Sequence, residues 1–335
     1  MTDHEGLRLM AVEMGRQCGD ALTTLDANRS VAERIAADIQ TERRLVLYGI
    51  GGSHYVNRMV EPLYREAGIE CRAMSPSEAL MAPLPADGRV ALFASQSGES
   101  GEIVELLKTP AGRDRRCGMT LAGESTLARH VDKVMVASGG PENAFAASRS
   151  IILTVAMHAA VLKELGIDAE PLSEILATDA PADMAKVDQV LADCDTIVFA
   201  GRHVMQGVAQ SAALSLMELA RVPAIGLESG QFRHGPFEFL RPGIGVVLLR
   251  SDGPDHPSIA PIARTCVEAG CSTMILDAGN GDLPEGVLSV RLPRGKGLAA
   301  ATSMLLSLQQ LNIAVAKRTV REAIGTPRFT SKVTI

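Results

Sequence analysis

The sequence predicts an α/β protein made of two tandem units, each a doubly wound, mainly parallel sheet between layers of helices, as in flavodoxin-like three-layer sandwiches. Three observations predict this class. Short apolar strands alternate with helical segments, Gly- or Ser-rich turns follow the strands, and the same order of segments occurs twice. A chain of 335 residues is long enough for two domains that each bury a core.

The N-terminal segment, residues 1–40, is expected to be helical, because Leu7, Met10 and Met14 begin an apolar series at helical spacing. The first sheet-forming unit is predicted over residues 41–168. Its apolar runs predict strands over 44–48, 90–94, 117–122 and 133–137.

The second unit, predicted over residues 189–320, repeats this pattern. Its strands are expected to begin at residues 196, 243, 271 and 286. Between the units, Pro171, Pro181 and several acidic residues interrupt the apolar pattern. A last helix is predicted over about 298–323, and residues 321–335 are predicted to form a tail that closes over the site.

The composition excludes several classes of protein. A net charge of −6 argues against a broad nucleic-acid surface, and no apolar run is expected to span a membrane. The six cysteines include no Cys-x-x-Cys pair, and the N-terminus does not resemble a signal peptide. We therefore expect a cytoplasmic protein with reduced thiols. No ligand spacing typical of a metal site is found, and no cofactor is expected.

The segment Ser95–Ser100 (Ser-Gln-Ser-Gly-Glu-Ser) follows a predicted buried strand and begins a helix. Open α/β sheets bind ligands at this position. Its hydroxyls, its amide and the N–H groups of the helix start can donate hydrogen bonds to a phosphate. The same residues would also be compatible with a simple helix cap.

The segment Gly49–His54 (Gly-Ile-Gly-Gly-Ser-His) ends the first strand. It departs from the Gly-x-Gly-x-x-Gly fingerprint because His54 stands where the third glycine belongs. It therefore favours close approach of the backbone to a ligand, with Ser53 as a donor, over an NAD site. A plain turn and an NAD-dependent dehydrogenase remain alternatives.

Three further residues have ordinary interpretations by themselves. Glu218 lies on an apolar helix, where burial would raise its pKa, but from the sequence alone a solvated helix face is the favoured interpretation. His234 lies in a Gly- and Pro-containing loop, and Lys332 lies near the C-terminus. Only a family resemblance gives these three residues a role.

Together these motifs resemble the sugar isomerase (SIS) family, and most closely the isomerase half of glucosamine-6-phosphate synthase and its stand-alone relatives. The matching segments include 49–53, 95–100, 142–149 and the His234-Gly-Pro loop, and the tail from Pro327 resembles the family's ending. The resemblance therefore covers nearly the whole chain and implies tandem SIS domains.

The resemblance also implies roles for individual residues. Ser95, Gln96, Ser97 and Ser100 would hold a phosphate, with Ser53 near the sugar. Glu218 would move a proton between C1 and C2, a subunit-lent His234 would assist ring opening, and Lys332 would cover the sugar. A lent histidine implies at least a homodimer.

Two departures from the synthase are present. Ser211 and Ser215 stand where the synthase has a glutamate and a lysine, and Thr2 follows Met1 where its glutaminase has a cysteine. We therefore expect a phosphosugar isomerase or deaminase without a glutaminase, acting on an aminosugar or ketose 6-phosphate. A fructosamine-6-phosphate deglycase and a non-catalytic phosphosugar-binding regulator are the alternatives.

Overall fold

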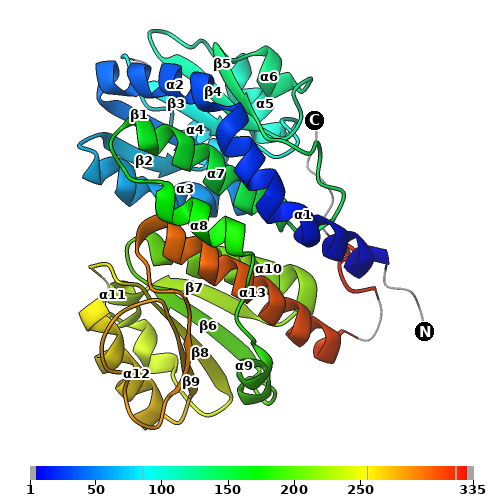
Figure 1. Ribbon diagram of the computed structural model, residues 1–335, viewed down its shortest axis with the longest axis vertical. Helices are drawn as coiled ribbons and strands as arrows, with labels where there is room; N and C mark the ends of the chain where they lie inside the picture. Colours follow the sequence, from blue (N-terminus) through cyan, green and yellow to red (C-terminus); the bar gives the residue numbers. More distant parts are fainter. Residues whose placement is uncertain (1–4, 86, 255, 321–322, 330–335) are drawn as a thin grey trace. The chain divides into compact units, whose positions relative to one another are not determined.

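The computed structural model describes residues 5–85, 87–254, 256–320 and 323–329. The chain divides into two compact units. Among the described residues, the first unit comprises residues 10–177 and 327–329, and the second comprises residues 178–326 and 5–9. Figure 1 shows that each unit contains one sheet with helices packed on it.

The first unit contains a five-stranded sheet in the order β2-β1-β3-β4-β5, with every neighbouring pair parallel. Its strands are β1 (Arg44–Tyr48), β2 (Glu70–Met74), β3 (Val90–Ala94), β4 (Arg115–Thr120) and β5 (Lys133–Val136). The helices up to the start of the second unit are α1 (Glu5–Ala27), α2 (Arg29–Glu42), α3 (Gly52–Glu66), α4 (Pro76–Met81), α5 (Gly101–Lys108), α6 (Thr126–Arg129), α7 (Arg149–Glu164) and α8 (Glu170–Thr178).

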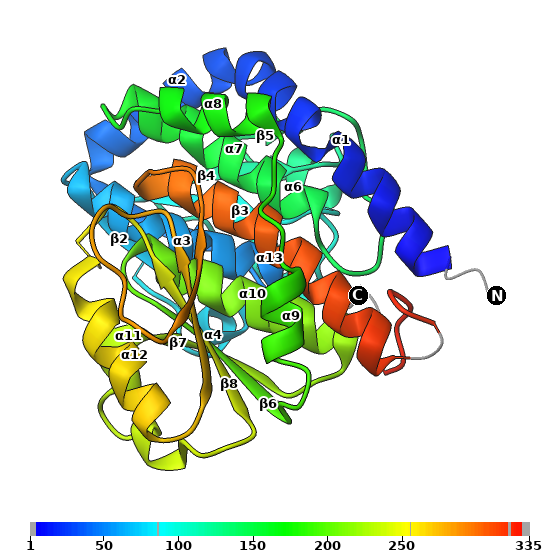
Figure 2. The same cartoon turned by 60° about the horizontal axis from the view of Figure 1, so that its bottom comes forward.

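The second unit contains a parallel sheet in the order β10-β9-β8-β6-β7. Its strands are β6 (Thr196–Gly201), β7 (Ala224–Glu228), β8 (Ile244–Arg250), β9 (Ser272–Asp277) and β10 (Leu288–Arg291). Its helices are α9 (Ala185–Val190), α10 (Val204–Ala220), α11 (Ser229–Phe232), α12 (Ile259–Glu268) and α13 (Gly297–Thr319), with short 3₁₀ turns η1 (Pro236–Phe239) and η2 (His256–Ser258). Figure 2 shows α10 and α13 on one side of this sheet and α12 on the other.

Numbered within each unit, both sheets have the order 2-1-3-4-5, which is the flavodoxin-like doubly wound order. This confirms the predicted α/β class and the internal repeat. The sheets are entirely parallel. In this order the chain reverses its direction of winding between strands 1 and 3, which are β1 and β3 in the first unit and β6 and β8 in the second.

The sequence-based prediction missed one strand in each unit. Both missed strands, β2 and β7, lie at a sheet edge, next to β1 and β6 respectively. Their residues are only partly buried, whereas β3 and β8 are buried throughout. A strand buried on both faces gives a continuous apolar run, and a half-exposed edge strand does not.

The helix predicted over residues 5–40 is in fact two helices, α1 and α2, separated at Asn28. The Asn28 side chain accepts a hydrogen bond from the Val136 N–H at 3.1 Å and donates one to the Val136 carbonyl at 2.9 Å. These bonds attach the helix junction to β5. Asparagine readily bonds to backbone groups in this way, which favours a break in a helix.

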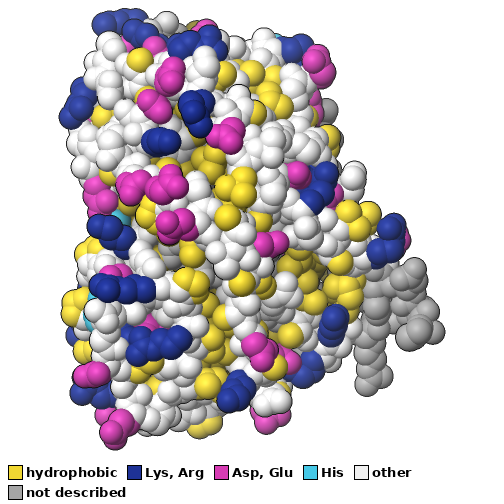
Figure 3. Space-filling model, viewed as in Figure 1, with side chains coloured by type: hydrophobic (Ala, Val, Ile, Leu, Met, Phe, Trp, Pro, Cys, Tyr) yellow, Lys and Arg dark blue, Asp and Glu magenta, His cyan; other side chains and the backbone are white. Residues whose placement is uncertain are grey.

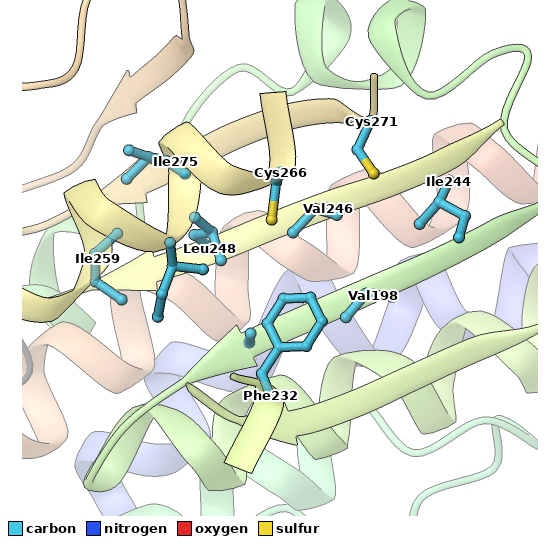
Figure 4. Packing of buried hydrophobic residues seen from close by; sticks show 12 residues of the cluster. Val198, Phe232, Ile244, Val246, Leu248, Ile259, Cys266, Cys271 and Ile275 are labelled. Carbon is cyan, nitrogen blue, oxygen red and sulfur yellow. The ribbon is translucent and has the colours of Figure 1, made fainter. Parts of the chain in front are cut away.

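One hydrophobic cluster of the second unit lies between its sheet and α12. Figure 4 shows Phe232 beside Val198 and Val246, with Ile259 and Cys266 of α12 close to Leu248 of β8. Phe232 is fully buried, and its ring meets that of Phe237 edge to face at a centroid distance of 4.9 Å. This aromatic pair anchors both sides of the loop that contains His234.

One helix, α13, is long and apolar enough to cross a membrane by length and composition, contrary to the expectation from the sequence. However, 83% of its most apolar window is buried. It packs against α10 in the second unit. A core helix of a globular domain has the same properties, so this feature by itself is weak evidence for a membrane span.

The surface mixes charges of both signs. On the face drawn in Figure 3, the described basic and acidic side chains are interspersed and form no continuous basic patch.

Candidate functional site

A pocket of about 140 Å³ lies in the first unit, where the loops after β1 and β3 meet the start of α7. The carboxyl ends of strands 1 and 3 are where a sheet of this order binds ligands. Among the described residues that line the pocket, none carries a charged side chain. They are Ile50, Gly52, Ser53, Gln96, Ser97, Ser100, Ala147, Ser150, Ile151 and Thr154.

The loop after β1 brings backbone close to this pocket. A Cβ on Gly52 would lie 2.7 Å from Ile151 Cδ1, and a Cβ on Gly49 would lie 2.7 Å from Asn57 Nδ2. Gly51, the N-cap of α3, has φ 58° and ψ −131°, a conformation that side chains disfavour. Glycine at these positions lets α3 begin beside the pocket, with Ser53 in its first turn.

The loop after β3 is held by its own hydrogen bonds. Ser95 is buried and does not line the pocket; its Oγ accepts from the Gly98 N–H at 3.1 Å and lies 2.9 Å from Ser100 Oγ. Either hydroxyl of this pair can be the donor, and when Ser95 donates to Ser100 the Ser100 proton is left for a ligand. Ser97 Oγ accepts from the Glu99 N–H at 3.2 Å, so its proton is also available.

Glu99 is the one acidic residue of this loop, and its carboxylate is engaged outside the pocket. It accepts from the Thr126 N–H at 2.6 Å, at the start of α6. This backbone hydrogen bond lowers the pKa of Glu99. The carboxylate is therefore held in its charged form on α6 and is not among the pocket-lining groups.

Glu142 connects the loop after β3 to α7. Its carbonyl accepts from Gln96 Nε2 at 3.2 Å, so one proton of the Gln96 amide is used inside the protein. Its carboxylate accepts from the N–H groups of Ser148 at 3.0 Å and Arg149 at 2.7 Å, which cap the N-terminus of α7. The same carboxylate also accepts from the hydroxyl of Ser150, which lines the pocket.

A buried ion pair fixes the segment that leads into α7. The Arg149 side chain is fully buried, and its Nε donates to Glu13 Oε2 at 2.6 Å. Its other nitrogens donate to Asp20 Oδ2 at 3.0 Å and to the Gly140 carbonyl at 2.7 Å. Burial alone would raise the pKa of Glu13, but hydrogen bonds from the Asn143 N–H and Arg149 lower it overall.

The structure thus brings Ser53, Gln96, Ser97 and Ser100 together around one pocket and places Ser95 beneath them. Sequence reasoning assigned no role to Ser150 and Thr154, which also line it. Their spacing of four residues on an apolar helix was a signal for a shared face. It did not indicate which ligand group they would meet.

Glu218 lies in the second unit, on α10, and is partly buried. Desolvation raises its pKa to about 7. No described residue forms a hydrogen bond or ion pair with its carboxyl group, so burial acts without compensation. Ser211 and Ser215 lie on the same helix. A carboxyl group of this kind can take up and release a proton near neutral pH.

His234 is exposed in the second unit, between α11 and η1. Glu228 caps α11 by accepting from the Gln231 N–H at 2.7 Å, and it also binds Arg202 Nε at 3.1 Å. Gly235 follows with φ 116°. These contacts fix the loop backbone while leaving the imidazole accessible.

Lys332 lies outside the described residues. In the part of the chain that the structure covers, no group of three His, Cys, Asp or Glu side chains could hold a metal ion.

No protein-family model matches the chain. A glutamine–fructose-6-phosphate aminotransferase (isomerizing) of Oceanobacillus iheyensis is 27% identical over 210 residues, which are 58% of this chain and 35% of that protein. The Staphylococcus aureus counterpart is 24% identical over 269 residues, 75% of this chain and 45% of that protein. The chain therefore spans less than half the length of these curated relatives.

Solved structures match over nearly the whole chain. The C-terminal domain of a glucosamine-fructose-6-phosphate aminotransferase from Francisella tularensis has a TM-score of 0.85 at 17% identity, covering 95% of this chain and 98% of that one. A tagatose-6-phosphate ketose/aldose isomerase from Escherichia coli has a TM-score of 0.81 at 18% identity, and the match covers 96% of each chain. A glucosamine-6-phosphate deaminase from Thermotoga maritima has a TM-score of 0.67 at 17% identity, and the match covers 94% of this chain and 99% of that one. At these identities the likeness establishes the fold.

Proposed function

Because the chain resembles the C-terminal isomerase domain of glucosamine-6-phosphate synthase and stand-alone phosphosugar isomerases, and has the fold of tandem SIS domains, we propose that it converts a sugar phosphate. The substrate is an aminosugar or ketose 6-phosphate. The observation that carries this proposal is the pocket after β1 and β3, where neutral donors and two helix starts are available to a phosphate.

In the proposed reaction Ser53, Ser97 and Ser100 donate hydrogen bonds to the phosphosugar, and Ser95 and Gln96 hold the loop. Glu218 removes a proton from the carbon next to the carbonyl or imine, giving an enol or enamine, and returns it to the neighbouring carbon. A pKa of about 7 supports this role, because general acid–base catalysis is most efficient when the pKa lies near the working pH.

Ring opening is assigned to His234, whose exposed imidazole is accessible to a second subunit, and covering of the sugar to Lys332. This assignment requires at least a homodimer, which we propose to act in the cytoplasm. Sizing in solution tests it directly: a fully active monomer would contradict the lent histidine.

Three outcomes share this proton step. Isomerisation returns the proton to the neighbouring carbon. Deamination adds water to the imine and releases ammonia, and deglycation of a fructosamine phosphate releases the amine instead. Isomerisation and deamination together form the main proposal, and deglycation is an alternative; the Thermotoga maritima deaminase shares the fold of this chain. A regulator that binds a phosphosugar without converting it is the alternative of a different class.

The first experiment measures thermal stability with glucosamine-6-phosphate, fructose-6-phosphate, a fructosamine-6-phosphate and galactosamine-6-phosphate. A ligand at a hundred times its dissociation constant adds about 2.7 kcal/mol of stability. We expect a clear upward shift with at least one of them, followed by release of ammonia, amine or isomer. No shift with any compound would contradict the proposal.

The second experiment separates an enzyme from a regulator. Glu218→Gln should retain binding of the sugar phosphate and lose turnover, because the amide cannot accept the proton. Glu268→Gln, an exposed glutamate at the end of α12, is the matched control and should behave like the wild type. Binding by the wild type without turnover of any compound would favour the regulator.

A further inference from the structure

The side of the pocket formed by α7 differs chemically from the sides formed by the two loops. Ser150 Oγ donates its proton to the Glu142 carboxylate, and Thr154 Oγ1 donates to the Ser150 carbonyl at 2.7 Å. Carboxylate and carbonyl oxygens only accept, so the direction of both bonds is fixed. Each hydroxyl has a single proton, and both protons are therefore used inside the protein.

The two hydroxyl groups on the α7 side can consequently only accept hydrogen bonds from a ligand. Ser150 and Thr154 are almost fully buried, at 3% and 6% exposure, yet both line the pocket. On the opposite side, Ser97 has a hydroxyl proton to offer, and Ser100 has one when Ser95 donates to it. A phosphate needs donors and is therefore favoured at the loops, whereas an N–H or O–H group of the ligand is favoured at α7.

The charge behind the α7 side points in the same direction. Glu142 is only 2% exposed, and no described Lys, Arg or His forms an ion pair with it. The nearest cation in sequence, Arg149, gives its guanidinium to Glu13, Asp20 and backbone carbonyls. A carboxylate that is compensated only by a helix start and hydroxyls leaves negative potential next to Ser150. This potential favours a cationic donor over a neutral one.

We propose that Ser150 and Thr154, backed by the Glu142 carboxylate, form a specificity-determining wall that selects a protonated amine on the phosphosugar. The inference rests on the proposed function and narrows its substrate class to zwitterionic aminosugar phosphates. The phosphate is held by the loops after β1 and β3, and the ammonium group donates to the Ser150 and Thr154 oxygens. Glu142 acts through Ser150 and is a positioning residue.

The test measures dissociation constants at pH 7 by calorimetry in a Glu218→Gln background, where the sugar is not converted. The probes are glucosamine-6-phosphate, 2-deoxyglucose-6-phosphate and inorganic phosphate. We expect glucosamine-6-phosphate to bind at least tenfold more tightly than the 2-deoxy compound. Ser150→Ala should reduce this preference about tenfold, the value of one charged hydrogen bond, and change the affinity for inorganic phosphate less than twofold.

Ser97→Ala is the matched control on the donor side: it should weaken all three probes and keep the preference. Glu142→Gln should reduce the preference as Ser150→Ala does, which a purely structural role would not produce. The proposed wall would be overturned if Ser150→Ala kept the preference for glucosamine-6-phosphate over the 2-deoxy compound. It would also be overturned if Ser150→Ala weakened the binding of inorganic phosphate as much as that of glucosamine-6-phosphate. If none of the three probes binds the parent Glu218→Gln protein, both the proposed function and the proposed wall fail.

Discussion

The loop after β3 in the first unit and the loop after β8 in the second have the same topological position but different chemistry. The first begins Ser95-Gln96, and the second begins Ser251-Asp252. The Asp252 N–H donates to the Gly295 carbonyl at 2.8 Å, and its carboxylate accepts from Arg294 Nε at 2.8 Å. The second loop therefore bonds within its own unit, and its carboxylate is paired with Arg294, where the first loop offers neutral donors.

The comparison shows that the doubly wound sheet supplies a position, whereas the loop residues decide whether an anion can use it. Even the starts of the helices after strand 1 agree in shape. Gly51 has φ 58° and ψ −131°, and His203, the N-cap of α10, has φ 55° and ψ −128°. The two units thus share backbone geometry at this position and differ in side chains.

The largest effect is expected from copying the charge of the second loop into the first. Gln96→Asp makes the first loop begin Ser-Asp and places a carboxylate on the pocket lining. Repulsion of a phosphate at this distance costs several kcal/mol, so the affinity for inorganic phosphate should fall roughly a thousandfold. Calorimetry with inorganic phosphate measures it.

The reciprocal change, Asp252→Gln, is its control. It should leave phosphate affinity at the wild-type value, because Asp252 does not line the pocket of the first unit. Gln96→Asn keeps the neutral amide on a shorter side chain, so it separates the effect of charge from that of shape. It should reduce the affinity for inorganic phosphate much less than Gln96→Asp does. Similar losses in Gln96→Asn and Gln96→Asp would show that charge does not distinguish the loops.

Sequence patterns were sufficient for the central strands and for the loop that holds Ser97 and Ser100, because buried strands and serine-rich helix starts are local signals. They were insufficient for β2 and β7, which lie half-exposed at sheet edges. They also missed Ser150, because its direction of donation depends on Glu142, which the fold brings to it. The raised pKa of Glu218 was considered from its apolar neighbours, but the size of the shift required the packing of α10.

Each unit contains a titratable group whose pKa is strongly shifted by burial. The contributions of these two groups to stability change with pH in opposite directions. In the second unit, burial raises the pKa of Glu218 from 4.5 to about 7. The folded chain therefore binds this proton more tightly, and stability from this group is full below pH 4.5 and is lost as the pH rises to about 7. Glu218→Gln should remove this loss and raise the free energy of unfolding at pH 8 by roughly 3 kcal/mol.

Urea unfolding at pH 4 and pH 8 measures the difference. At pH 4 the variant and the wild type should agree, because the protonated carboxyl and the amide are similar in size and charge. The same difference in the free energy of unfolding at pH 4 and at pH 8 would mean that burial of the charged carboxylate is not its cause.

In the first unit the corresponding group is His158, which is fully buried between Tyr64 and Asn57. Desolvation lowers its pKa from 6.5 to about 3. Its contribution to stability is therefore full above pH 6.5 and is lost as the pH falls, by about 1.4 kcal/mol for each pH unit. Hydrogen exchange of first-unit amides between pH 6.5 and 5 should show this loss, and His158→Gln should abolish the slope.

The smallest expected effect concerns the shared backbone conformation at the helix starts. No atom lies within 4 Å of a Cβ built on Gly51, so Gly51→Ala adds no clash and its cost is conformational. We expect a loss of about 1 kcal/mol in urea unfolding. Gly15→Ala, in the middle of α1 with equally open space, should instead gain about 0.8 kcal/mol. If both substitutions stabilise, the conformation is not strained for residues with a side chain. His203 would then adopt this conformation in the second unit without cost. The difference between Gly51 and His203 would in that case not affect the stability of either unit.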